Sequence, residues 1–366
     1  MSEKFEDIIG KDIRKGNPFR GIYVPESSKI LLDIAFKRAL RTSPPGGVRL
    51  NIIKKKKSVT ITRIKVLSEE LSNALINLVK KFPSTDTMHP FYLSTMEIWL
   101  SKDDYKKTLA KIHGAAQLIR RIARDYIIQI RSTRKTEVMA VRDVLNKIDR
   151  LRQEAYGRIS SVVNSLDKDL RTLANLVKKM KRLPDYDPEL PTIVVAGPPN
   201  SGKSSFVKTV SNARVEIASY PFTTKEVTFG HIELRVNHLL TKKVQIADTP
   251  GLFDRPLNER KEPELLALKA IQHIADIVLF LFDGSTEAVM NMEEQLGVYK
   301  TVKTFFGSGK PFIIAVNKMD IADKDLVNKI SERVKKDNAE VFYISIKTGQ
   351  NIDTVLNKIK ELLEQH

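Results

Sequence analysis

A short apolar stretch leads directly into a glycine-rich turn that ends in lysine and serine. The stretch is Thr192–Ala196, and the turn reads Gly197-Pro-Pro-Asn-Ser-Gly202-Lys203-Ser204. The two glycines let backbone N–H groups wrap an anion without clashes from a Cβ atom, and the helix that starts near Lys203 favours negative charge at its first turn. A strand, phosphate loop and helix in this order are typical of doubly wound α/β folds. The sequence therefore predicts an α/β P-loop domain with a mostly parallel, six-stranded sheet.

The side chains of this loop predict a nucleoside triphosphate with Mg²⁺ as the ligand. Lys203 supplies a positive charge to the β- and γ-phosphates, and the Ser204 hydroxyl is a ligand for Mg²⁺. A chance glycine-rich turn is the alternative, but such a turn needs neither a strand before it nor a helix after it. The loop residues expected to contact the nucleotide are Pro199, Asn200, Ser201, Gly202, Lys203, Ser204 and Ser205.

A second phosphate-reading segment, Asp248-Thr-Pro-Gly251, lies 45 residues after Lys203. The Asp248 carboxylate can hold Mg²⁺ directly or through water, and the N–H of Gly251 can approach the γ-phosphate. Alone, this tetrapeptide would be read as an ordinary turn. Its position at the end of an apolar strand favours the functional interpretation.

Two further segments select the base. The first, Asn317-Lys-Met-Asp320, follows a buried strand. The Asp320 carboxylate can accept hydrogen bonds from the ring N–H and the amino group of guanine, which adenine cannot supply, and the stem of Lys318 can cover the base. The second, Ser345-Ile-Lys347, follows the last expected strand and is weak evidence by itself. The residues expected to contact the base are Asn317, Lys318, Asp320, Ser345, Ile346 and Lys347. In this order the segments predict a GTP/GDP-binding domain.

The loop Ser219–Thr224 lies between the phosphate-binding helix and the expected hairpin. A threonine hydroxyl here would complete the Mg²⁺ shell only when the γ-phosphate is present, and Thr223 and Thr224 are both candidates. After Gly251 come Leu252 and Phe253, so no glutamine or histidine orients a water there. Intrinsic hydrolysis is therefore expected to be slow unless a partner or an ion assists.

Residues 1–184 show helical periodicity without sustained strand alternation, which predicts a helical bundle or hairpin. The expected helices span residues 26–41, 61–81, 89–101, 102–131 and 137–182. A proline-spaced linker, residues 185–190, leads into the nucleotide-binding domain, residues 191–366. Its expected strands span residues 192–196, 226–235, 243–247, 277–282, 312–316 and 341–345, and its final helix spans residues 352–365.

The excess positive charge lies almost entirely in the helical half. Residues 1–190 carry 39 Lys and Arg against 22 Asp and Glu, whereas the remainder of the chain is nearly neutral. This asymmetry predicts a polyanionic partner, nucleic acid ahead of membrane. A solvated helix face is the alternative for each single residue. The candidate RNA contacts are Arg49, Lys54, Lys55, Lys56, Lys57, Arg120, Arg121, Arg131 and Arg134.

Composition narrows the remaining classes. There are no cysteines, which excludes disulfides and thiol catalysis. No stretch approaches the roughly 18 apolar residues of a membrane span, and the polar N-terminus does not resemble a secretory signal. We expect a cytoplasmic protein with no membrane partner and no small-molecule substrate beyond GTP.

Together these segments resemble the Obg-related branch of translation-factor-class GTPases. Gly-x-Pro-Asn-x-Gly-Lys-Ser and Tyr-x-Phe-Thr-Thr are features of that branch, and here they begin at Gly197 and Tyr220. The segment Asn17-Pro-Phe-Arg-Gly-Ile-Tyr23 and the helical half are similar to the nucleolar GTP-binding protein family of large-subunit ribosome assembly factors. The resemblance covers essentially the whole chain, in what looks like a shorter, archaeal-type form without the long C-terminal extension of eukaryotic members.

The resemblance implies roles for single residues. Thr224 is implied as the Mg²⁺-sensing threonine, and it joins Lys203 and Gly251 as a catalytic residue. Asn200 is implied as a K⁺ ligand, as in cation-activated relatives, and Leu252 matches the apolar residue after Asp-x-x-Gly. Ile346 stands where alanine is commoner in the family. The contact there is a backbone N–H, so the change is expected to be tolerated.

The favoured function is a GTPase switch that binds rRNA or the large ribosomal subunit through its basic helices. One alternative is a GTPase associated with RNA modification, and the other is a membrane-associated GTPase. The absence of a second cofactor motif disfavours the first alternative. The lack of an anchor and of an aromatic amphipathic face beside the lysine run disfavours the second.

Overall fold

The computed structural model describes residues 16–43, 51–134, 140–183, 186–211, 216–218, 227–235, 241–249, 261–307, 309–335 and 340–365. These residues form two compact units, which we call the helical unit and the sheet unit. The helical unit comprises residues 18–85 and 100–179. The sheet unit contains residues 86–99, the described residues from Met180 onward, and Gly16 and Asn17. Residues 86–99 thus belong to the sheet unit, although the expected boundaries 1–184, 185–190 and 191–366 follow the order of the sequence.

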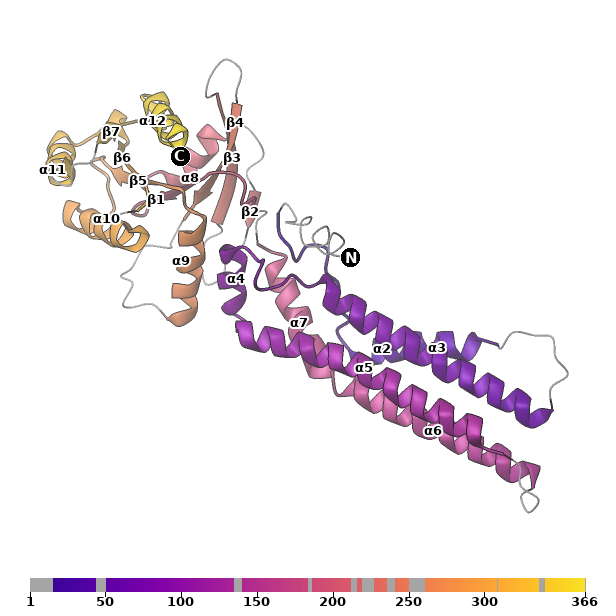
Figure 1. The fold of residues 1–366 in the computed structure, drawn as a ribbon. Helices are drawn as coiled ribbons and strands as arrows, with labels where there is room; N and C mark the ends of the chain where they lie inside the picture. Colours follow the sequence, from indigo (N-terminus) through magenta and orange to yellow (C-terminus); the bar gives the residue numbers. More distant parts are fainter. Residues whose placement is uncertain are drawn as a thin grey trace. The chain divides into compact units, whose positions relative to one another are not determined.

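The described part of the sheet unit contains a seven-stranded sheet in the order β2-β3-β4-β1-β5-β6-β7 (Figure 1). The strands are β1 Thr192–Ala196, β2 Glu216–Ala218, β3 Val227–Arg235, β4 Thr241–Asp248, β5 Ile277–Asp283, β6 Phe312–Asn317 and β7 Val341–Tyr343. β3 pairs antiparallel with β2 and β4, and the other neighbours are parallel. The predicted doubly wound α/β fold is confirmed, and the three-residue strand β2 adds to the six strands expected.

Helices cover the central strands on both faces, which explains why those strands are continuously apolar. The helices are α8 Lys203–Val210, α9 Glu262–Ile274, α10 Met292–Phe306, α11 Lys324–Lys335 and α12 Ile352–Glu364. Every residue of β1 and β5 is buried. On one face, Leu279 of β5 packs in a core that includes Phe206 of α8 and Ile359 of α12. Strands covered on both faces lose the alternation of polar and apolar residues seen in half-exposed sheets.

The helical unit is a bundle built from long antiparallel helices. Its helices are α2 Ser28–Arg41, α3 Ile52–Lys81, α5 Lys102–Ser132, α6 Val141–Asn164 and α7 Asp167–Met180, the last residue of which belongs to the sheet unit. α3 packs on α2, α5 and α6, and α5 packs on α6. Ile64, Leu67 and Leu71 of α3 are buried at helical spacing together with Tyr105 of α5. Burial of one apolar stripe per helix holds such a bundle together.

Two expected helix boundaries in this unit were wrong. α3 begins at Ile52 rather than Ile61, because the Asn51 side chain accepts a hydrogen bond from the N–H of Ile53 and caps the helix. The lysine run is therefore helical. The single helix expected over residues 137–182 is divided into α6 and α7 by a turn at Ser165 and Leu166. Asp167, which begins α7, accepts a hydrogen bond from the N–H of Ser28 at 2.9 Å, so a tertiary contact fixes the new start.

A short helix, α4 Pro90–Glu97, joins the sheet unit from between α3 and α5 in the sequence. It packs on α9. The hydroxyl of Tyr92 accepts a hydrogen bond from the N–H of Tyr186 at 3.1 Å. The next residue, Asp187, exchanges two hydrogen bonds with the buried Gln245 side chain of β4, of 3.0 and 2.8 Å. α4 and the segment before β1 are thus fastened to the strand that carries Asp248.

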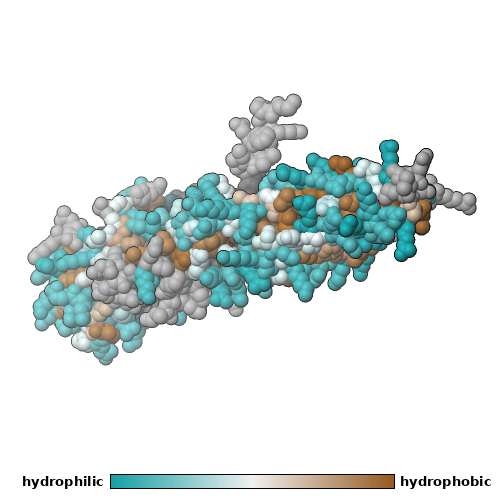
Figure 2. All heavy atoms as spheres, turned by 90° about the horizontal axis from the view of Figure 1, so that it is seen from below, coloured by the Kyte–Doolittle hydropathy of each residue, from teal (hydrophilic) through white to brown (hydrophobic). Residues whose placement is uncertain are grey.

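Among the described residues, no helix is both long and apolar enough to cross a membrane. The face drawn in Figure 2 is mostly hydrophilic, with hydrophobic patches scattered between polar side chains.

Candidate nucleotide-binding site

The loop between β1 and α8 has a backbone that only glycine can adopt at two positions. Gly197 has φ +150°, and a Cβ atom there would lie 2.3 Å from the carbonyl oxygen of Leu281. Gly202 has φ +97°, and a Cβ atom there would lie 2.3 Å from Nδ2 of Asn317. The loop therefore passes against β5 on one side and the end of β6 on the other. A glycine-rich loop with such a path can present its backbone N–H groups to a bound anion.

Lys203 lies across this loop. Its side chain is buried, and Nζ donates hydrogen bonds to the carbonyl oxygens of Gly197 at 2.9 Å and Pro198 at 2.7 Å. The ammonium group is held at the mouth of the loop and at the N-terminus of α8, where partial positive charge gathers. An arrangement of this kind suits the phosphates of a nucleotide.

Ser204 and Asp248 meet on the other side of Lys203. The Ser204 hydroxyl donates a short hydrogen bond to the carboxylate of Asp248, which has no exposed surface. A hydroxyl and a carboxylate side by side are hard oxygen donors, so they fit Mg²⁺. In the described ranges no group of three acidic or histidine side chains is placed to hold a metal. Phosphate oxygens of a bound nucleotide would be further hard donors for such an ion. Thr224 and Gly251 lie outside the described residues, as do Thr223, Leu252 and Phe253.

Asn317 joins three of the predicted segments. Its Nδ2 donates to the carbonyl oxygen of Ser201 in the phosphate loop at 2.8 Å. Its Oδ1 accepts from the N–H of Ile346 at 3.1 Å. Asn317 is itself buried at the end of β6. The phosphate loop, the Asn317-Lys-Met-Asp320 segment and the Ser345-Ile-Lys347 segment are therefore locked together without any ligand.

The carboxylate of Asp320 is positioned as a hydrogen-bond acceptor by a neighbouring serine. Its Oδ1 accepts from the hydroxyl of Ser345 at 2.6 Å. This hydrogen bond, with smaller contributions from the backbone and from the charges of Lys347 and Lys318, lowers the pKa of Asp320 below its ordinary value. The carboxylate is therefore ionised at neutral pH. An ionised acceptor at this position suits the two adjacent N–H groups of guanine.

A cavity of about 520 Å³ lies beside these groups. It is lined by Asn200, Gly202, Ser205, Thr209, Asn317, Lys318, Asp320, Ile321, Ile346 and Lys347. Eight of these ten are residues predicted from the sequence to contact the nucleotide. Thr209 and Ile321 were not predicted, because neither belongs to a recognised segment. The cavity lies where β6 ends, at the carboxyl ends of the parallel strands, which is where open α/β sheets bind ligands.

Asp283, the last residue of β5, was also missed. It is 2% exposed, and its Oδ2 lies 2.6 Å from Nζ of Lys318. Its Oδ1 accepts from both the N–H and the hydroxyl of Ser285, at 3.0 and 2.7 Å. The sequence did offer a signal, since Asp283 is an acidic residue at the end of an otherwise apolar strand. The carboxyl ends of parallel strands are where ligands bind, so such a residue is a candidate for the site.

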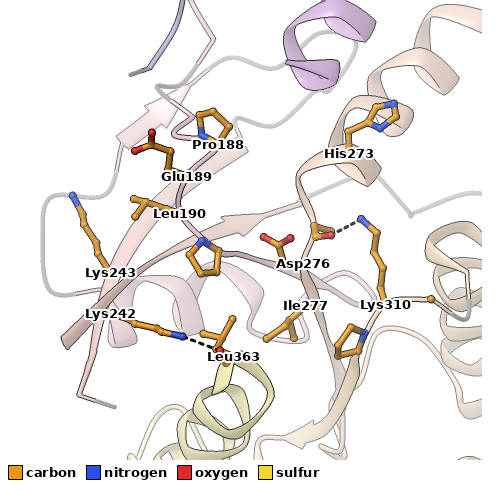
Figure 3. A pocket seen from close by; sticks show the side chains of 14 residues that line it. Pro188, Glu189, Leu190, Lys242, Lys243, His273, Asp276, Ile277, Lys310 and Leu363 are labelled. Atoms are coloured by element: carbon orange, nitrogen blue, oxygen red, sulfur yellow. Dashed lines mark hydrogen bonds between the residues drawn. The ribbon is translucent and has the colours of Figure 1, made fainter. Parts of the chain in front are cut away.

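A larger cavity, of about 800 Å³, lies at the other end of the strands, where β1, β5 and β6 begin (Figure 3). Two of the three lysines that line this cavity donate hydrogen bonds to backbone carbonyl oxygens of the protein. Lys310 donates to the carbonyl oxygens of Gln272 and Ala275 at the end of α9, and Lys242 donates to that of Leu363 at 2.9 Å. None of the predicted phosphate- or base-contacting residues lines this cavity. The smaller cavity is therefore the candidate nucleotide site.

The structure divides the candidate RNA contacts into two kinds. Lys56 forms an ion pair with Asp149 at 2.8 Å, and Arg120 donates to Asn73 at 2.9 Å. Lys57 donates to the carbonyl oxygens of Arg131 and Thr133 at the end of α5, and burial lowers its pKa. These side chains hold the bundle together. The first part of α3 and the end of α5 therefore lie at the same end of the bundle.

For the other described candidates no partner side chain has been named above, and all of them are exposed. We call Lys54, Lys55, Arg131 and Arg134 the basic end, since they are exposed where α3 begins and α5 ends. Arg142, exposed near the start of α6, adds to the charge there and was not predicted. Arg121 is exposed farther along α5, and Arg49 lies outside the described residues.

The fold and the site define a class: a P-loop GTPase domain that follows a helical region in the chain. Comparison with known proteins agrees with this class. Residues 19–187 match the family described as the NOG1 N-terminal helical domain, and residues 192–318 match the family described as 50S ribosome-binding GTPase.

Individual relatives cover most of the chain. An uncharacterised protein of Methanocaldococcus jannaschii is 31% identical over 86% of this chain and 84% of its own length. Nucleolar GTP-binding protein 1 of Drosophila melanogaster is 31% identical over 83% of this chain and 44% of its own length. A crystal structure of a nucleolar GTP-binding protein 1 from Plasmodium falciparum is 31% identical and covers 50% of this chain and 91% of its own, with a TM-score of 0.42. The chain belongs to the nucleolar GTP-binding protein 1 family, and it spans less than half of the Drosophila relative.

Proposed function

We propose that this protein is a guanine-nucleotide switch that hydrolyses GTP to GDP and phosphate and acts in assembly of the large ribosomal subunit by binding rRNA. The pair of hydrogen bonds made by Asn317 is the observation that most supports guanine-nucleotide binding in this proposal. They hold the phosphate loop and both base-reading segments in one arrangement. An arrangement formed before binding costs little to complete when the ligand arrives.

Each group of the site has a role in this proposal. Lys203 holds the β- and γ-phosphates, and Asp320 accepts from the two N–H groups of guanine. Ser204 and Asp248 would hold Mg²⁺, which supplies charge neutralisation to the phosphates when it is bound. The N–H of Gly251 and the hydroxyl of Thr224 would respond to the γ-phosphate, so that their loops differ between the GTP and GDP states.

Turnover is proposed to be slow, because Leu252 cannot orient the attacking water. Asn200 lines the nucleotide cavity and is the proposed K⁺ ligand. A K⁺ ion there would add positive charge beside the phosphates. The expected result is a higher kcat for GTP in K⁺ than in Na⁺, and equal values would remove this role from Asn200.

The ribosomal part rests on the names of the relatives and on charge. One matched family is described as 50S ribosome-binding GTPase, and the Drosophila relative is named nucleolar GTP-binding protein 1. The basic end presents four cations that are exposed, whereas Lys56 and Lys57 serve the bundle. Exposed Lys and Arg that gather at one end of a helical bundle are suited to phosphate groups of RNA.

The test is co-sedimentation of the purified protein with isolated large ribosomal subunits in K⁺ buffer, with a nonhydrolysable GTP analogue or with GDP. Isolated small subunits are the control. Greater association with large subunits in the analogue state supports the proposal. Absence of association in both states, with guanine-nucleotide binding intact, would leave a GTPase and overturn the ribosomal assignment.

A further inference from the structure

The buried carboxylate of Asp283 lies at the end of β5, in contact with a residue that lines the base-binding cavity. Asp283 is the register partner of Asn317 in the parallel pair β5 and β6, so the ends of the two strands place it beside Lys318. Oδ2 of Asp283 lies 2.6 Å from Nζ of Lys318. Lys318 lines the cavity. The ammonium group at one end of its stem is thus held by an acidic group that the recognised segments do not contain.

Hydrogen bonds hold both the backbone and the carboxylate of Asp283 in place. Its N–H donates to Oε1 of Gln295 at 2.9 Å, and its carbonyl oxygen accepts from Nε2 of Gln295 at 3.0 Å. Gln295, on α10, has no exposed surface. Ser285 donates twice to Oδ1, which leaves Oδ2 directed at Lys318. A carboxylate with so little freedom fixes the position of its partner.

The backbone of Lys318 indicates the same role. Its φ is +67°, in the left-handed region that side chains other than glycine rarely adopt. Strain of this kind persists where the surroundings hold a residue in a required position. Without a fixed partner, a lysine stem with four rotatable bonds would lose considerable entropy when it packs over a base.

We infer that Asp283 is a positioning residue for guanine-nucleotide binding, which acts by holding the ammonium group of Lys318 so that its stem lies along the base. This inference rests on the proposed nucleotide-binding function. In this arrangement Asp320 selects guanine, and Asp283 keeps the stem of Lys318 in place along the base. Asp283 contacts Lys318 rather than the nucleotide, so its effect depends on Lys318.

A double-mutant cycle tests that dependence. The protein is loaded with GDP that carries a fluorescent N-methylanthraniloyl group on the ribose, and its dissociation is followed after addition of excess GDP. Asp283→Asn keeps the shape and the hydrogen bonds from Ser285 but removes the charge. It is expected to speed dissociation roughly tenfold, the size of a lost charge-assisted hydrogen bond. In the Lys318→Met background the same substitution is expected to change the rate by less than about twofold.

The outcomes separate this inference from the proposed function. Equal acceleration by Asp283→Asn in both backgrounds, or no acceleration in either, would overturn the inference. Failure of the unmodified protein to bind the labelled GDP would instead overturn the proposed function. Ser285→Ala is the second variant if Asp283→Asn does not fold. It is expected to speed dissociation about twofold to threefold, again only when Lys318 is present.

Discussion

The side chains of the nucleotide site are held by one another, whereas the cations of the basic end project into solvent. In the site, Asn317, Asp320 and Lys203 each make at least one hydrogen bond of 2.9 Å or less to another part of the site. At the basic end, Lys54 and Arg131 are exposed, and the shape of the bundle comes from their neighbours. A small, specific ligand needs groups that are already in position. A long polyanion needs only charge that is spread over a surface.

This contrast predicts different sensitivity to substitution. One change in the interlocked site should remove most of the binding, since each group also holds its neighbours. One change at the basic end should have a small effect that adds to others. Three variants test the contrast and a fourth tests the packing of α4 on α9; they follow in order of decreasing effect.

Lys203→Ala is expected to have the largest effect. It removes the ammonium group from the phosphate loop and leaves the carbonyl oxygens of Gly197 and Pro198 without their donor. Affinity for GDP should fall about 100-fold or more, because hydrogen bonds from a charged donor are the strong ones. Titration calorimetry measures this change. Affinity for large-subunit rRNA should stay the same, and a parallel loss of both would contradict the division between the two regions.

Asp320→Asn is expected to change which base is bound. The amide presents N–H donors where guanine also presents donors, so GDP affinity should fall by roughly 100-fold. Xanthine has a carbonyl in place of the amino group of guanine, so the affinity for xanthosine diphosphate should rise. Competition with a labelled nucleotide gives both values. A variant that weakens both nucleotides equally would show that Asp320 supports the fold rather than reads the base.

The double variant Arg131→Ala, Arg134→Ala is expected to weaken rRNA binding about threefold to tenfold and to lower the slope of log affinity against log salt by about 1.5. The carbonyl oxygen of Arg131 that accepts from Lys57 remains. The matched control is Lys106→Ala, Lys107→Ala, which removes two exposed cations near the other end of α5. If both doubles weaken binding equally, net charge rather than the basic end attracts the RNA.

His89→Asn is expected to have the smallest effect. Burial, followed by the charge of His273, lowers the pKa of His89, while Asp276 opposes the change. Folding favours the neutral form of this side chain, so its contribution to stability is complete above the ordinary pKa of about 6.5 and is lost as the pH falls toward the lower, folded value. Asparagine can still cap α4, as Nδ1 of His89 does by accepting from the N–H of Phe91.

The measurement is the melting temperature of the sheet unit between pH 7.5 and 5.5. The unmodified protein should lose about 1–3 °C more than the variant over this range. Identical pH profiles would show that protonation of His89 does not destabilise the packing of α4 on α9.

Much of the sheet unit was predictable because burial on both faces leaves a plain signal. The stretch from Ile277 to Phe282 is continuously apolar, and β5 occupies it. The nucleotide-contacting segments follow the strands because parallel strands bring their ends to one edge. β2 was missed, since three residues give too short a pattern to distinguish from a loop.

The remaining differences arise from contacts between distant residues. The lysine run has no apolar period, so only the cap by Asn51 and the packing of α3 show that it is helical. The division between α6 and α7 lacks a proline or glycine and depends on Ser28, more than 130 residues away. Asp283 belongs to no recognised segment. Its role depends on the register of β5 with β6, which the sequence does not state.

The central claim is that the interlocked site reads guanine. The most direct measurement is a calorimetric titration of the unmodified protein with GDP and with ADP in a buffer that contains Mg²⁺ and K⁺. Asp320, held as an ionised acceptor by Ser345, predicts that GDP binds at least about 1000-fold more tightly than ADP. Similar affinities for the two nucleotides would contradict the account.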